Sequence, residues 1–279
     1  FQIDINNIKI SATRTDKVPN TSATAASAGS DLNGMAAFNA SEIIKGRMTG
    51  IAAKHFDVLD SEVEFRQNRI YAGNESISFA ELAQMTWAER VSLSATGYYK
   101  TPDIYWDPKN LRGNPFYYFT YGACVSEVII DTLTGESRVL RADMLQDCGK
   151  SLNPTVDYGQ IEGAFVQGMG WLTSEELVWD DQGRLLTHGP STYKIPGSRD
   201  VPPDFNIHIL EDAPNRFPTI FRSKAVGEPP LMLAISVWLA IRDAVARIGE
   251  GGLMPKLNAP ATPEAILMAI NDVRQRARK

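Results

Sequence analysis

The feature that most constrains this chain is an apolar run at residues 229–247, which opens with Pro229 and Pro230. Proline is favoured in the first turn of a helix, where its missing N–H would have no partner anyway. Leucine, isoleucine, valine, methionine and tryptophan side chains recur on nearly every side of this helix. A helix that is apolar all round is normally buried. The run therefore predicts a buried helix with Glu228 directly before its first turn.

Glu228 has two interpretations on its residue type and position. It is either a carboxylate placed at the positive end of the helix dipole, or a partly desolvated general base that takes a proton from a substrate or ligand. The residues around Glu228 do not choose between these two roles.

A second segment of interest, residues 24–31, is small and polar and leads into a helix that we expect to run to about Lys54. Small residues at a helix entrance leave backbone N–H groups free to bind an anion such as a phosphate. The alternative is an ordinary N-cap formed by Ser27, Ser30 or Asp31. The sequence contains neither GxGxxG nor GxxxxGK[ST], so it does not indicate a Rossmann or P-loop nucleotide site.

A third segment, residues 157–172, is expected to form a helix unusually rich in glycine. Its glycines are Gly159, Gly163, Gly168 and Gly170. Each costs about 1 kcal/mol relative to alanine in a helix, and close approach of a backbone or a ligand is the usual reason for keeping them. Gln160 has an amide that could bind the polar edge of a cofactor. Alternatively, the glycines serve helix packing, and Gln160 is a buried polar group with internal partners.

The remaining pattern mixes helices with antiparallel strand pairs and lacks regular βαβ alternation, which favours an α+β fold. The other expected elements are strands at 7–14, 91–100, 116–131, 137–147 and 205–210, hairpins at 61–72 and 175–187, a helix at 79–90 capped by Ser78, and a helix at 263–276. We expect two subdomains, 1–105 and 106–279, divided within a proline- and glycine-rich stretch at 101–115.

Composition excludes several classes of function. A net charge of −5 argues against nonspecific nucleic-acid binding. The two cysteines are too few for a disulfide framework and fit a reducing cytoplasm. No HExxH motif indicates a zinc site, and no apolar stretch of about 18 residues indicates a membrane-spanning helix. The chain opens without methionine, so we expect it to be a piece of a longer protein.

The three segments, taken in order, resemble the xanthine dehydrogenase family. Further runs share the resemblance: Phe-Thr-Tyr-Gly at 119–122, Ser-Leu-Asn-Pro at 151–154 and Gly-Pro-Ser-Thr-Tyr-Lys-Ile-Pro at 189–196. The resemblance covers nearly the whole chain. It implies the C-terminal half of the aldehyde oxidase/xanthine dehydrogenase molybdopterin-binding domain, an α+β fold of mixed sheets packed with helices.

The resemblance also implies an activity, which is oxidation of hypoxanthine and xanthine to urate in purine catabolism, on a molybdenum-molybdopterin cofactor. Glu228 falls on the catalytic base of the family. The implied cofactor-binding positions are Thr24, Ala25, Ala26, Ser27, Gly29 and Gln160. Gly29 stands where some members have a serine whose hydroxyl helps to hold the cofactor, so its contact could come only from the backbone. The metal is held through the pterin and has no protein ligand in this chain.

Other parts of the enzyme are implied to lie elsewhere: the N-terminal half of the molybdenum domain with the purine-binding residues, and the 2Fe–2S and FAD domains or subunits, within a homo- or hetero-oligomer. The chain alone is therefore expected to be inactive. Two alternatives remain, an aldehyde oxidase-type hydroxylase and a non-catalytic scaffold domain of the same fold. The unbroken run at 189–196 favours xanthine dehydrogenases, and molybdenum analysis of the parent protein would separate an enzyme from a scaffold.

Overall fold

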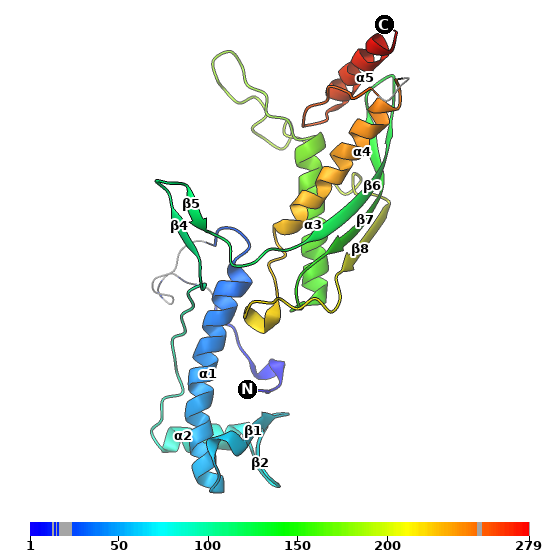
Figure 1. The fold of residues 1–279 in the computed structure, drawn as a ribbon. Coiled ribbons are helices and arrows are strands. Elements are labelled where there is room, and N and C mark those ends of the chain that lie inside the picture. Colours follow the sequence, from blue (N-terminus) through cyan, green and yellow to red (C-terminus); the bar gives the residue numbers. More distant parts are fainter. Residues whose placement is uncertain (13, 15, 17–23, 250–252, 279) are drawn as a thin grey trace. The chain divides into compact units, whose positions relative to one another are not determined.

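The structure is a computed structural model that describes residues 1–12, 14, 16, 24–249 and 253–278. It consists of two units, Phe1–Tyr117 and Tyr118–Lys279, and each has its own hydrophobic core. The predicted division between residues 105 and 106 falls inside strand β4 (Tyr105–Asp107), which pairs with β5 (Arg112–Asn114). Helices and antiparallel and mixed sheets together make an α+β fold, as predicted (Figure 1).

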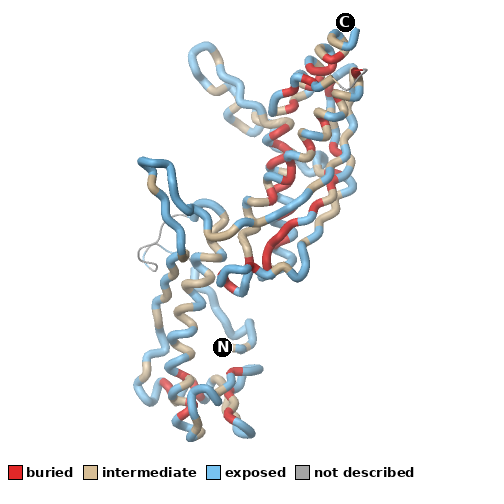
Figure 2. Tube along the Cα trace, in the orientation of Figure 1, coloured by how far each residue is buried: buried red, intermediate tan, exposed pale blue. Residues whose placement is uncertain are grey.

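The first unit combines a long helix with a three-stranded antiparallel sheet, a short helix and the β4–β5 hairpin. Its other elements are η1 (Ile5–Asn7), α1 (Gly29–Phe56), η2 (Asp60–Glu62), β1 (Val63–Arg66), β2 (Arg69–Ala72), β3 (Glu75–Ser78) and α2 (Phe79–Ala88). The core of this unit lies at the C-terminal end of α1, where Met48 and Ala52 pack with Phe65, Ile70 and Leu82 (Figure 2).

Local signals predicted several of these elements correctly. The long helix, the hairpin and the helix beginning after Ser78 are all present. Ser78 and Glu81 form a capping box, in which each side chain accepts a hydrogen bond from the other residue's backbone N–H. Gly73, at φ +58°, turns the chain from β2 into a third strand that we did not predict.

Two predicted strands in this unit are absent. Among the described residues of 7–14, the only regular element is the end of the 3₁₀ turn η1. Residues 91–100 are extended but run along α1, where Arg47 donates to the carbonyl oxygens of Ser92 and Ser94 at 3.0 and 2.9 Å. Gly97 allows close contact, since a Cβ on it would lie 2.8 Å from the backbone nitrogen of Ala40. An extended segment can thus be held by helix side chains instead of a neighbouring strand.

The second unit is a three-stranded mixed sheet covered on one face by helices. Its elements are β6 (Gly122–Ile130), β7 (Ser137–Gln146), α3 (Pro154–Thr173), β8 (Asp204–Ile209), η3 (Ile220–Arg222), η4 (Pro229–Ala234), α4 (Ile235–Ala246) and α5 (Pro263–Ala277). Strands β6 and β7 are antiparallel, whereas β8 runs parallel to β7 because the chain crosses over through α3 between them. The hairpin predicted at 175–187 is reduced to one isolated bridge between Trp179 and Leu185.

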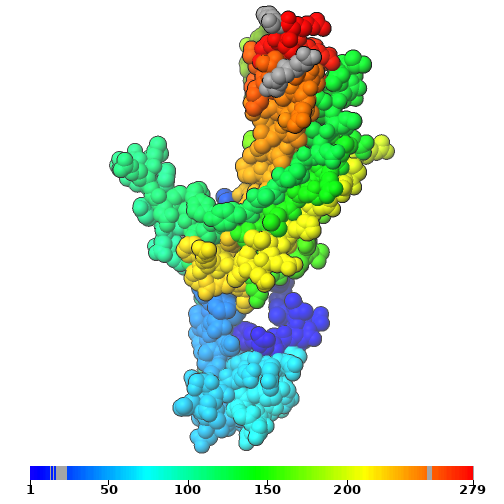
Figure 3. Space-filling model, turned by 45° about the vertical axis from the view of Figure 1, so that its right-hand side comes forward, coloured from blue at the N-terminus to red at the C-terminus, as the bar shows by residue number. Residues whose placement is uncertain are grey.

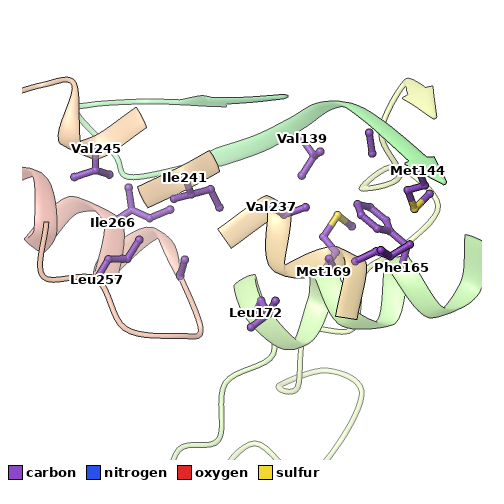
Figure 4. Close-up of a cluster of buried hydrophobic side chains, with 14 of the residues drawn as sticks. Val139, Met144, Phe165, Met169, Leu172, Val237, Ile241, Val245, Leu257 and Ile266 are labelled. Carbon is purple, nitrogen blue, oxygen red and sulfur yellow. The ribbon is translucent and has the colours of Figure 1, made fainter. Parts of the chain in front are cut away.

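The core of the second unit lies between the sheet and helices α3 and α4. Figure 4 shows Phe165 and Met169 of α3 and Val237 of α4 directed toward Val139 and Met144 of β7. Further along α4, Ile241 and Val245 meet Ile266 of α5 and Leu257. This core fixes how α3, α4 and the segment between β8 and α4 pack together.

The helix predicted at 229–247 is present as the 3₁₀ turn η4 followed by α4, but the prediction that it is buried all round is wrong. One side carries core residues such as Leu233 and Val237, while Met232, Ile235 and Leu239 are exposed. By length and composition alone, Pro229–Ala246 could also cross a membrane. In the structure, η4 packs against α3 and α4 packs against β6.

Candidate functional site

Glu228 occupies the N-cap position of η4, so its predicted place at a helix start is confirmed. Its side chain is exposed and makes no capping hydrogen bond, and it forms no ion pair with any residue that the structure describes. The expectation that Glu228 is partly desolvated is wrong for this chain. Only its backbone is tied into the turn, through the Leu231 N–H, which donates to the Glu228 carbonyl at 3.0 Å. The carboxylate is therefore open to a ligand.

The segment that carries Glu228, residues 223–228, has no regular secondary structure, but its first residues are fastened to residues 147–150. Ser223 forms an antiparallel bridge with Gly149, and the Lys224 N–H donates to the Cys148 carbonyl at 2.8 Å. Gly149 has φ +61°, and a Cβ there would lie 2.6 Å from the Arg222 carbonyl oxygen. Only glycine fits this conformation and this close contact.

A buried ion pair adjoins this bridge. Lys224 Nζ lies 2.5 Å from Asp147 Oδ2, and the two side chains are 11% and 4% exposed. Next to the pair is a hollow of about 560 Å³ with aromatic walls from Tyr118, Phe119 and Tyr121. A second hollow, of about 800 Å³, is lined in part by residues 194–196 of the Gly-Pro-Ser-Thr-Tyr-Lys-Ile-Pro run. Gln160 and Glu228 line neither hollow.

The Ser-Leu-Asn-Pro run starts helix α3, which carries Gln160. Asn153 is the N-cap, and its side chain accepts a hydrogen bond from the Val156 N–H. The Ser151 hydroxyl donates to the carboxylate of Asp157, a buried residue, at 2.5 Å. Gln160 itself is exposed, and within the described residues its amide has no hydrogen bond. The interpretation of Gln160 as a satisfied buried polar group is therefore wrong.

The four glycines of α3 divide into two pairs with different surroundings. A Cβ on Gly159 or Gly163 would meet nothing within 4 Å, so these glycines leave the exposed helix face beside Gln160 without side chains. Gly168 and Gly170 are instead in tight contact. Gly168 packs against Leu231 and Ala234 of η4, and Gly170 packs against Pro196. Packing explains only the second pair.

The close contact at Gly168 joins the helix that carries Gln160 to the turn that carries Glu228. Helix α3 and η4 make one of the most extensive contacts of the second unit. Gln160 and Glu228 thus lie on two elements that pack against each other, and both side chains are exposed. Each of these side chains is open to a ligand.

The other predicted cofactor-binding residues belong to the first unit. Thr24, Ala25 and Ala26 are exposed, Ser27 and Gly29 are half-buried, and Ala26 has a left-handed conformation with φ +60°. Helix α1 begins at Gly29 with Ala28 as its N-cap and no side-chain capping bond. The alternative in which Ser27, Ser30 or Asp31 caps the helix is therefore wrong. Since no side chain at the N-cap serves as acceptor, an oxygen of a ligand could take that role.

The types of donor in these two regions fit a polar organic cofactor. Backbone N–H groups at the start of a helix can bind a phosphate. The Gln160 amide, on a helix face without side chains at the neighbouring glycines, can bind the polar edge of a ring that carries amide groups. In the part of the chain that the structure describes, no three histidine, cysteine, aspartate or glutamate side chains gather as metal ligands. Cys124 and Cys148 are free and are separate from Gln160 and Glu228 in the sequence. Burial raises the pKa of the Cys148 thiol to about 12.

Sequence reasoning missed the Asp147–Lys224 pair. Lys224 lies inside the run that carries Glu228, but Asp147 is 77 residues away from it. No spacing rule links two positions so far apart. An aspartate at the end of a predicted strand was the only signal, and it is a weak one.

The chain is similar to known proteins over nearly its whole length. The family model for the molybdopterin cofactor-binding domain matches residues 1–202. The chain is 48% identical to a xanthine dehydrogenase of Dictyostelium discoideum over 273 residues, which cover 95% of this chain and 19% of that protein. It is 46% identical to a xanthine dehydrogenase/oxidase of Felis catus over 278 residues, which cover 98% of this chain and again 19% of the relative.

Solved structures show the same fold. A carbon monoxide dehydrogenase from Oligotropha carboxidovorans superposes with a TM-score of 0.75 at 20% identity, covering 94% of this chain and 31% of that one. An aldehyde oxidoreductase from Desulfovibrio desulfuricans ATCC 27774 superposes with a TM-score of 0.67 at 25% identity, covering 91% of this chain and 24% of that one. The chain belongs to the molybdopterin cofactor-binding domain family, in a segment that it shares with xanthine dehydrogenases.

Proposed function

We propose that this chain is the part of a xanthine dehydrogenase that helps to hold the molybdopterin cofactor and supplies Glu228 as the catalytic base. One observation carries the proposal. Glu228 is an exposed carboxylate with no internal partner among the described residues, on a turn packed against the helix of Gln160. Apart from a weak interaction with the dipole of the turn, this leaves the carboxylate free for a ligand.

Each predicted site residue has a role in this proposal. The cofactor supplies the two-electron oxidation when it is bound. The Gln160 amide binds a polar edge of the cofactor, and the backbone of residues 24–27 and Gly29 binds its pterin and phosphate. Glu228 accepts a proton at a carboxylate oxygen as the substrate is hydroxylated. A positioned general base of this kind contributes about 100- to 10,000-fold to the rate.

The proposal extends to partners that this chain does not contain. We infer that purine binding and electron transfer through 2Fe–2S clusters and FAD belong to other parts of the parent protein, and that the purine is xanthine or hypoxanthine. We also infer a cytoplasmic location, which two free cysteines favour.

The test uses the full-length parent protein and compares Glu228→Gln with Glu211→Gln, which changes another exposed glutamate of the same unit. We expect Glu228→Gln to slow urate formation by about 100-fold or more while the molybdenum content stays at the parental level. Glu211→Gln should keep the parental rate. A parental rate in Glu228→Gln would disprove the role of base, and Gln160→Ala should lower molybdenum retention.

A second candidate is an aldehyde oxidase-type hydroxylase, which the similarity to the aldehyde oxidoreductase structure supports. The same full-length protein separates the two when its turnover of xanthine is compared with that of an aromatic aldehyde. Faster turnover of the aldehyde by about 100-fold or more would favour this candidate. A parent protein without molybdenum and without either activity would favour a scaffold domain.

A further inference from the structure

We propose that Asp147 and Lys224 form a positioning pair that holds Glu228 in its working place. This inference rests on the proposed function of Glu228 as a base. The two residues form a buried ion pair beside the irregular segment that carries Glu228.

Residues 223–228 need such an anchor because no helix or strand holds them. The backbone bonds to residues 147–150 end at Lys224. One more bond follows, in which the Tyr118 hydroxyl accepts from the Ala225 N–H at 2.8 Å. Beyond it, the next hydrogen bond of the chain is the Leu231 N–H to Glu228 itself. Glu228 therefore sits between an anchored start and the packed turn η4.

The Lys224 ammonium is bound from several sides. It donates to Asp147 Oδ2 and, at 3.0 Å, to the Phe119 carbonyl, and it lies 5.3 Å from the centre of the Tyr121 ring. Asp147 is also held at both ends, because its Oδ1 accepts from the Gly149 N–H at 2.9 Å and its own N–H donates to the Tyr121 carbonyl at 2.8 Å. The pair thus links three segments: residues 119–121, 147–149 and 223–225.

Packing also fixes the chain on both sides of Glu228. Val226 packs against the core of this unit, Pro230 is buried, and Leu231 presses on Gly168 of α3. Only a few residues separate Glu228 from Lys224 on one side and from the packed residues Pro230 and Leu231 on the other. Loss of the Lys224 side chain would remove the ion pair and leave only the backbone bonds of residues 223–225 to hold this end of the segment. A misplacement of about 1 Å at a catalytic group can cost about 100-fold in rate.

The kinetic test uses the full-length molybdenum-loaded protein with Lys224→Met, Asp147→Asn and the double variant. We expect kcat to fall 10- to 100-fold, KM for xanthine to change less than about 3-fold, and molybdenum content to stay parental. The double variant should lose no more than the worse single variant, because the two side chains act as one unit. Arg276→Met breaks the half-buried pair with Asp272 at 2.7 Å on α5, serves as a control for loss of an ion pair elsewhere in the same unit, and should keep the parental kcat.

A positioning role predicts a specific dependence on Glu228. In the Glu228→Gln background, Lys224→Met should slow single-turnover reduction by less than about 2-fold further, since there is no base left to misplace. A full multiplicative loss would overturn the proposal. The proposal would also be overturned if the single variant Lys224→Met had parental turnover while the single variant Glu228→Gln was inactive. Parental turnover in Glu228→Gln would instead overturn the proposed function on which it rests.

A second readout does not depend on activity. Hydrogen exchange in the full-length protein should rise at least 10-fold in Lys224→Met for the hydrogen-bonded amides of this stretch, and should stay unchanged in α5. These amides belong to Ser223, Lys224, Ala225 and Leu231. Figure 1 shows α5 against the end of α4 that is away from η4, so it reports on unrelated opening. Unchanged exchange at 223–231 would show that the pair does not hold the segment and would overturn the proposal.

Discussion

Gly168 of α3 lies directly against the backbone of Leu231 in η4. A Cβ atom on Gly168 would meet the Leu231 carbonyl oxygen at a separation that real structures do not show, and would lie 2.9 Å from the Cβ of Ala234. This contact connects the glycine-rich helix with the turn that begins after Glu228. The contact explains why α3 has a glycine at position 168, since a side chain there would collide with η4. The sequence alone did not show this reason.

Gly168→Ala should therefore destabilise the chain. The obstructing atoms belong to backbone and to a buried alanine, which cannot move aside, and overpacking of this kind costs about 1–3 kcal/mol. The free energy of unfolding, measured by urea denaturation, should fall by that amount. Gly163→Ala is the matched control on the same helix. It enters open space and should raise the free energy of unfolding by about 0.5–1 kcal/mol. Equal effects of the two substitutions would contradict this description of the contacts.

Gly29→Ser should fit the fold and strengthen cofactor retention. A Cβ at Gly29 would lie 3.8 Å from Thr24 Cγ2, which is an ordinary contact, and the new hydroxyl would stand at the start of α1. The measurement is molybdenum per protein after gel filtration of the full-length parent. Gly46→Ser makes the same change further along α1, where a Cβ meets nothing within 4 Å, and should leave the molybdenum content unchanged. An equal gain in both variants would disconnect the effect from the helix start.

Cys148 should make the folded state lose stability in alkaline solution. Burial, with smaller contributions from Asp157 and Asp147, raises the pKa of this thiol from 9.0 to about 12. A raised folded pKa means that the stabilising contribution is complete below the unfolded pKa and is lost as the pH rises toward 12. Between pH 9 and 11, the free energy of unfolding should decline more steeply in the parent chain than in Cys148→Ala. Parallel pH profiles would refute this prediction.

The outer face of the sheet in the second unit should cause the isolated chain to self-associate. Side chains of β6 alternate, and Val125 and Ile129 are 72% and 57% exposed on the face away from the core. Figure 3 shows this strand (green) on the surface beside α4 (orange). Exposed apolar patches promote association, so light scattering should detect species larger than a monomer.

A surface variant tests that prediction. Val125→Lys combined with Ile129→Lys should shift the isolated chain toward the monomer. Circular dichroism should show unchanged secondary structure, because both side chains point away from the core. A parental chain that stays monomeric at high concentration would rule out association through this face.

Much of the secondary structure could be predicted because its signals are local. Ser78 with Glu81 defines the start of α2, and Pro229 and Pro230 define the start of the last apolar helix. Helix caps and proline positions depend on neighbouring residues only. The same locality misled us at 91–100, where an extended pattern does not tell whether the partner is a strand or a helix side chain such as Arg47.

The candidate site divides in the same way. Short runs of sequence were enough to identify the family of the chain. They also select Gln160 and Glu228 as candidate site residues, which stays a prediction. Which side of each helix is exposed, the parallel pairing of β8 with β7, and the burial of Lys224 against Asp147 depended on the fold. These properties depend on contacts between residues far apart in the chain, and such contacts form only when the packed core brings distant segments together.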